Sequence, residues 1–196
     1  MEIIKGNISW VDIVHPTPQD LKWIRETCRI HPLIIEELKV PSARARVEAH
    51  PAYLYLIYYF PIYDPKEQVS RRSEIDFLIT KKEVITVRYE AIEPLEELEK
   101  SLKPKSRALE DALQLTHKIL ETLLAHQQRQ LIHIHEKVDA ISKELFRERE
   151  EERERLLLEK ISYVKRDISQ YRLIVRPQKQ ILESFFSVGC AFLGSS

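Results

Sequence analysis

Two adjacent carboxylates, Glu36 and Glu37, stand in the run IHPLIIEEL at residues 30–38. Carboxylate oxygens are the ligands that hard cations such as Mg²⁺ prefer. On a helix, however, neighbouring residues are separated by about 100°, so these two side chains would point in different outward directions and would not readily grip one small ion together. The residues alone therefore favour a solvated helix face for this pair.

Histidines on a later segment are the second candidate for metal chemistry. His126 and His133 are seven residues apart and share one face of a predicted helix, as zinc ligands could. His133 and His135 do not face the same way, and no third ligand is obvious. We therefore interpret these histidines as solvent-facing or interhelix polar residues.

The sequence has no pattern that is typical of catalysis or of nucleotide binding. Its serines lack the context of a nucleophile elbow, and Cys28 lies on the predicted buried stripe of its helix. Three glycines in 196 residues argue against a glycine-rich phosphate loop. We therefore expect that the protein is not an enzyme.

The composition excludes several other classes of protein. Lys plus Arg and Asp plus Glu both number 31, so the zero net charge disfavours nonspecific binding of nucleic acid or anionic lipid. The longest apolar stretches, residues 53–62 and 185–193, are shorter than the roughly 18–20 residues of a membrane-spanning helix. The N-terminus lacks the pattern of a secretory signal, and the two cysteines form no CxxC pair, so we expect a cytoplasmic chain with free thiols.

The elements that position Glu36 and Glu37 belong to a predicted α/β domain at residues 1–104. Thr17 and Pro18 indicate the start of a helix. Predicted helices cover residues 18–28, 33–40 and 94–102, and predicted strands cover 8–14, 53–60, 74–80 and 84–89. Apolar residues alternate on both faces of residues 53–60, which favours an α/β/α sandwich with a mixed, partly antiparallel sheet between helices.

Residues 105–196 are predicted to form a long antiparallel helical hairpin that projects from the sheet. Apolar residues spaced three and four apart give each helix a seam. The predicted seams consist of Leu120, Leu124, Leu131, Ile134, Val138, Ile141 and Leu145, and of Leu157, Ile161, Val164, Ile168, Tyr171 and Val175. The charged residues 148–155 are expected at the tip, and Pro177 is expected to interrupt the returning helix.

Several segments, spread over almost the whole chain, together resemble the cytoplasmic domain of CorA-type divalent-cation transporters. The most specific is the IHPLIIEEL run with its acidic pair. The others are WVD at 10–12, RVE at 46–48, YLYLI at 53–57, EIDFL at 74–78, VITVR at 84–88, HIHEKVDAISKELF at 133–146 with Asp139, residues 158–166, and RLIVRP at 172–177.

The resemblance implies a homopentamer in the cell membrane whose cytoplasmic part senses magnesium at subunit interfaces. It implies that Glu37 contributes one carboxylate to an ion site between subunits, that Glu36 corresponds to a second nearby site, and that Glu121 loosely matches a further acid. Co²⁺, Mn²⁺ or Ni²⁺ could replace Mg²⁺ at such sites. The membrane helices and the Gly-Met-Asn signature of that family are not in this sequence, so we expect it to be a cytoplasmic piece of a longer transporter.

Two alternatives remain open from the sequence. A zinc-transporting relative of the same family would share these patterns and would use a different ion. A soluble coiled-coil interaction module would instead use the charged tip of the hairpin to dock another protein.

Overall fold

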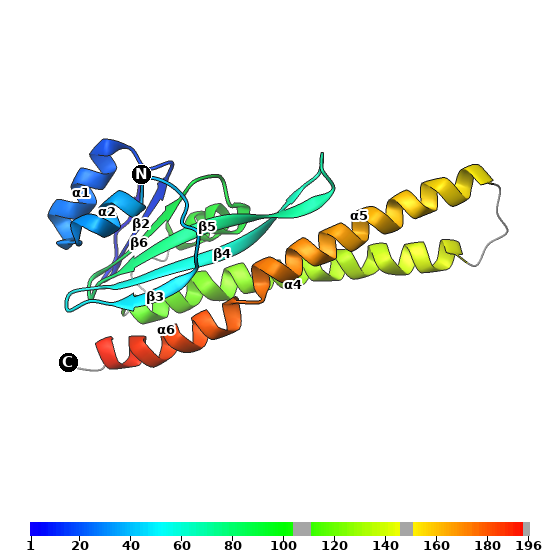
Figure 1. Ribbon diagram of the computed structural model, residues 1–196. Coiled ribbons are helices and arrows are strands. Elements are labelled where there is room, and N and C mark those ends of the chain that lie inside the picture. Colours follow the sequence, from blue (N-terminus) through cyan, green and yellow to red (C-terminus); the bar gives the residue numbers. More distant parts are fainter. Residues whose placement is uncertain (104–110, 146–150, 194–196) are drawn as a thin grey trace.

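The computed structural model describes residues 1–103, 111–145 and 151–193, and its centre is a six-stranded mixed sheet (Figure 1). The strand order is β1-β2-β6-β5-β4-β3, in which β2 and β6 are parallel and all other neighbours are antiparallel. The strands are β1 (Glu2–Ile4), β2 (Ser9–Val14), β3 (Arg46–Ala49), β4 (Leu54–Asp64), β5 (Val69–Ile79) and β6 (Glu83–Arg88). The predicted mixed sheet is confirmed, whereas β1 and β3 were not predicted.

Helices cover both faces of the sheet, so the predicted α/β/α sandwich is confirmed. Helices α1 (Pro18–Cys28) and α2 (Pro32–Glu37) pack on one face, and α3 (Glu93–Leu102), α4 (Ala112–Leu145) and α6 (Gln178–Leu193) pack on the other. Along β4, Leu56 and Tyr58 enter the core beneath α3 and α4, while Tyr55 and Ile57 enter the core beneath α1 and α2. Burial on both faces explains why this strand is apolar at nearly every position.

Local hydrogen bonds fix the starts of α1 and α2. Thr17 caps α1 because its Oγ1 accepts from the Asp20 N–H at 3.2 Å, while Asp20 Oδ2 accepts from the Thr17 N–H at 2.9 Å. At α2, Nδ1 of His31 accepts from the Leu33 N–H at 3.3 Å. Helix α2 ends at Glu37, before the predicted end at residue 40, so Glu37 lies at the carboxyl end of this short helix.

Strands β4 and β5 extend beyond their predicted ends as a two-stranded ribbon that runs alongside α5 (Glu151–Val175; Figure 1). The predicted strand ended before Pro61, which cannot donate a ladder hydrogen bond. In the structure β3 pairs only with residues 54–57 of β4, so Pro61 lies on an open edge of the sheet. No neighbouring strand among the described residues needs a backbone N–H donor from this position. Helix side chains satisfy this edge: Gln130 donates to the Pro61 carbonyl at 3.2 Å, and Gln178 donates to the Tyr59 carbonyl at 2.8 Å.

The helical part forms the predicted antiparallel pair, with α4 and α5 side by side and their far halves beyond the sheet (Figure 1). With 34 residues, α4 is about 51 Å long. Pro177 separates α5 from α6, as predicted. The predicted domain boundary at residues 104–105 and part of the charged tip lie outside the described residues. Among the residues that are described, none of the helices is both long and apolar enough to cross a bilayer.

Three predicted seam residues are exposed instead: Leu131, Leu145 and Ile168. On α5 the inward position belongs to Asp167, which is 2% exposed and whose Oδ1 accepts from the Ser70 N–H at 2.7 Å. On α4, Gln130 rather than Leu131 turns towards the ribbon. The predicted seam assumed that each helix packs only on the other, but the ribbon also presents backbone polar groups, and polar side chains must satisfy them.

Candidate cation site

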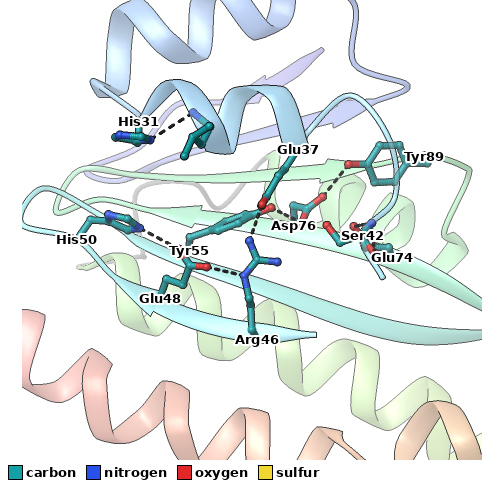
Figure 2. A network of polar contacts seen from close by, with 11 residues as sticks. His31, Glu37, Ser42, Arg46, Glu48, His50, Tyr55, Glu74, Asp76 and Tyr89 are labelled. Atoms are coloured by element: carbon teal, nitrogen blue, oxygen red, sulfur yellow. Dashed lines mark hydrogen bonds and ion pairs between the residues drawn. The ribbon is translucent and has the colours of Figure 1, made fainter. Parts of the chain in front are cut away.

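Of the three predicted ligands, Glu37 is the one that is paired with a residue of another element. It lies at the end of α2, and its carboxylate forms an ion pair with the Nη2 group of Arg46 on β3 (Figure 2). The Glu37 side chain is 42% exposed, so water reaches it. Glu37 therefore combines a position fixed by helix and sheet with access for a hydrated cation.

Glu36 and Glu121 lie on other surfaces. Glu36 pairs with Lys39 of its own helical turn at 2.5 Å, and Glu121 on α4 pairs with Lys118 at 2.9 Å. The hydrogen bond from Lys118 lowers the pKa of Glu121. One chain thus does not bring the three carboxylates together, and within the described residues no group of three or more His, Cys, Asp or Glu could hold a metal ion.

Arg46 links Glu37 to a second carboxylate. Its Nε donates to Oε1 of Glu48 at 2.5 Å, and Oε2 of Glu48 lies 3.2 Å from Nε2 of His50. Alternation along β3 places Arg46, Glu48 and, just beyond the strand, His50 on one side of the sheet. Partial burial opposes the charge on Arg46, but the hydrogen bonds to Glu48 and Glu37 outweigh it and raise its pKa, while the bond from Arg46 lowers the pKa of Glu48.

Two buried carboxyl groups of β5 lie beside this network (Figure 2). Asp76 accepts from the hydroxyl groups of Tyr55 and Tyr89 at 3.0 and 2.9 Å, and Glu74 accepts from the Ser42 N–H at 2.8 and 2.9 Å. Burial, with the nearby charge of Glu74, raises the pKa of Asp76 to about 8. Both acids belong to the predicted EIDFL strand, and no role was predicted for them, although acids in an otherwise apolar strand signal buried polar contacts.

The raised pKa of Asp76 predicts that stability falls as pH rises. A carboxyl group whose pKa is higher in the folded chain stabilises the fold fully below its unfolded pKa, and this contribution is lost as pH rises through the folded value. We expect the free energy of unfolding to fall between pH 5 and pH 8, and Asp76→Asn to flatten this dependence. Urea unfolding at both pH values measures it, with the exposed Glu36→Gln as the control. Equal slopes in wild type and Asp76→Asn would contradict the assignment to Asp76.

The histidines of α4 have separate partners. His126 packs against Phe60, with ring centroids 5.8 Å apart, and its burial lowers its pKa. His133 Nδ1 lies 3.0 Å from Oε2 of Glu136 on the exposed side of the helix. His133 is thus solvent-facing, as interpreted, whereas His126 packs on strand β4 rather than between helices.

Comparison with known proteins decides the family. The sequence profile of the family described as "CorA-like Mg²⁺ transporter protein" matches residues 5–191. The chain belongs to this family. CorA proteins are ion transporters rather than enzymes, in agreement with the absence of catalytic patterns in the sequence. A search of curated proteins finds no match to the chain.

Solved structures of CorA and of a relative share the fold. The complete CorA magnesium transporter from Methanocaldococcus jannaschii matches with a TM-score of 0.74 and 16% identity over 91% of this chain and 55% of that chain. Its soluble domain matches with a TM-score of 0.71 and 15% identity over 90% and 69%. The ZntB cytoplasmic domain from Vibrio parahaemolyticus matches with a TM-score of 0.58 and 15% identity over 92% and 74%. This chain therefore spans about half of a complete CorA protein and has the fold of its soluble domain.

Proposed function

We propose that the chain is the cation-sensing cytoplasmic part of a CorA-type divalent-cation transporter, with Glu37 as a cation ligand where copies of the chain meet. The observation that carries the proposal is the exposed Glu37 carboxylate at the end of α2, fixed in place against β3 in a chain of this family. Glu36 and Glu121 are proposed as secondary ligands because both are exposed carboxylates on other surfaces.

Carboxylates on separate surfaces are chemically sufficient to bind a divalent cation between subunits. Mg²⁺ keeps several of its waters and accepts only one or two carboxylates, so one acid from each of two facing surfaces can hold it. In a homopentamer, cations bound between subunits would offset the repulsion between carboxylates and hold a closed arrangement. When magnesium falls, that repulsion loosens the contacts and the pore opens. Co²⁺, Mn²⁺ and Ni²⁺ would bind the same ligands because carboxylate and water discriminate weakly among divalent ions.

Replacing Glu37 tests the proposal. We expect Mg²⁺ at about ten times its Kd to raise the thermal midpoint by about 3–6 °C and to promote self-association, and Glu37→Ala to remove most of both effects. Calorimetry and sedimentation velocity measure them. The control is Glu26→Ala, which removes an exposed glutamate of the adjacent helix α1. If Glu37→Ala and Glu26→Ala respond to magnesium as wild type does, Glu37 is not a ligand.

Zinc is the second candidate ion because the fold is also that of a ZntB cytoplasmic domain. The same titration with ZnCl₂ separates the two. A rise in thermal midpoint with zinc, at concentrations where magnesium has no effect, would favour a zinc-transporting relative. A soluble interaction module would respond to neither ion.

A further inference from the structure

We infer that Arg46 is a tethered counter-ion, which occupies the cation position at Glu37 and sets the divalent-cation concentration at which this carboxylate binds. The inference rests on the proposed role of Glu37 and adds its regulation. The Glu37 carboxylate, which is proposed to bind a divalent cation, is already paired with a positive charge, the guanidinium of Arg46 on β3 of the same chain (Figure 2).

The guanidinium of Arg46 lies between two carboxylates. Its Nη2 contacts Glu37 and its Nε donates to Glu48, so one positive charge serves two negative charges. The group is itself only 28% exposed, whereas Glu37 is 42% exposed. A hydrated cation can therefore reach the open side of Glu37, but it competes with Arg46 for the carboxylate and is repelled by the arginine charge.

Contacts other than Glu37 hold Arg46 in place. The backbone of Arg46 is paired with Ile57 in the sheet, its guanidinium lies 5.4 Å from the centre of the Tyr55 ring, and Glu48 binds its Nε. If a divalent cation takes Glu37, Arg46 keeps Glu48 and the ring. The exchange thus breaks one partly exposed ion pair, an interaction that is weak by itself, and leaves the remaining contacts intact.

Arginine suits the role of a counter-ion at Glu37 because of its permanent charge and weak hydration. A guanidinium stays charged throughout the physiological pH range, so Arg46 keeps its own positive charge. It is also weakly hydrated and binds carboxylates in a planar geometry, whereas Mg²⁺ keeps its waters. The balance between them therefore depends on divalent-cation concentration, which is the quantity that a sensor must report.

Removing the charge of Arg46 should tighten cation binding. We expect Arg46→Gln to increase the affinity for Mn²⁺, measured by electron paramagnetic resonance, by about tenfold, and the double variant with Glu37→Ala to lose this gain. The control is Arg72→Gln, because the Arg72 guanidinium lies 4.4 Å from the Tyr59 ring centre in a similar stacking contact. Wild-type or weaker affinity in Arg46→Gln would overturn the inference.

Two further readouts distinguish the failures. If Glu37→Ala weakens Mn²⁺ binding but Arg46→Gln does not tighten it, only the counter-ion role is wrong. If Glu37→Ala leaves Mn²⁺ binding unchanged in both backgrounds, the proposed function fails and the inference fails with it. Should Arg46→Gln not fold, nitrogen-15 NMR of wild type replaces it: MgCl₂ should shift the side-chain resonances of Arg46 and not those of Arg72. Stationary Arg46 resonances at saturating magnesium would overturn the inference.

Discussion

Replacing Asp12 by alanine is expected to destabilise the fold by about 3–5 kcal/mol. Asp12 on β2 and Arg88 on β6 are 3% and 2% exposed, and Oδ2 of Asp12 accepts from Nε and Nη2 of Arg88 at 3.0 and 2.9 Å. The Thr86 hydroxyl donates to Oδ1 of Asp12 at 2.6 Å and accepts from the Trp10 indole N–H at 2.9 Å. Removing the carboxylate leaves a buried guanidinium without its main counter-charge, between the two parallel strands of the sheet.

Urea unfolding of three variants separates the buried charge from other causes. Glu90→Ala breaks the more exposed pair of Arg71 with Glu90 and should cost less than about 1 kcal/mol. The double variant Asp12→Ala/Arg88→Met removes both buried charges and should recover much of the loss of Asp12→Ala, because no unpaired buried charge remains. An Asp12→Ala variant no less stable than Glu90→Ala would contradict the importance of this pair.

The fold could be predicted where its cause is local or periodic. The cap at Thr17, the break at Pro177 and the two-sided burial of residues 53–60 depend on residues close together in the chain, and the structure confirms them. The predictions are wrong where a segment distant in sequence determines the local structure. Strand β4 continues through Pro61 because β3 is too short to pair there, and Asp167 displaces Ile168 from the seam because the ribbon offers a backbone N–H.

The candidate site could be predicted only in part from the sequence, for the same reason. The run IHPLIIEEL indicates Glu36 and Glu37 as candidate ligands, and helix geometry correctly separates them: one pairs with Lys39 and the other with Arg46. The role of Arg46 depends on β3, which was not predicted because its four residues are flanked by irregular chain. No spacing rule connects a helix end to a strand that follows a turn, and only the folded chain brings Arg46 to Glu37.

Replacing Asp167 by alanine is expected to cost about 1–3 kcal/mol and to release the ribbon from α5. The variant leaves the buried Ser70 N–H, now 2.7 Å from Oδ1 of Asp167, without an acceptor. It also removes the buried carboxylate oxygen that lies 4.0 Å from the Lys137 ammonium on α4. Because this contact joins the sheet to both long helices, its loss should loosen the ribbon while the packing of α1 and α2 persists.

Hydrogen exchange measures this local effect. The Ser70 amide should lose protection in Asp167→Ala and keep most of it in Asp167→Asn, since asparagine retains an acceptor oxygen for the N–H. Glu159→Ala on the same helix is the control, because it removes a carboxylate that accepts an exposed hydrogen bond from the Tyr163 hydroxyl at 3.1 Å. Unchanged exchange at Ser70 in Asp167→Ala would mean that other contacts hold the ribbon. A change confined to the ribbon would instead identify Asp167 as the contact that holds the ribbon against the two long helices.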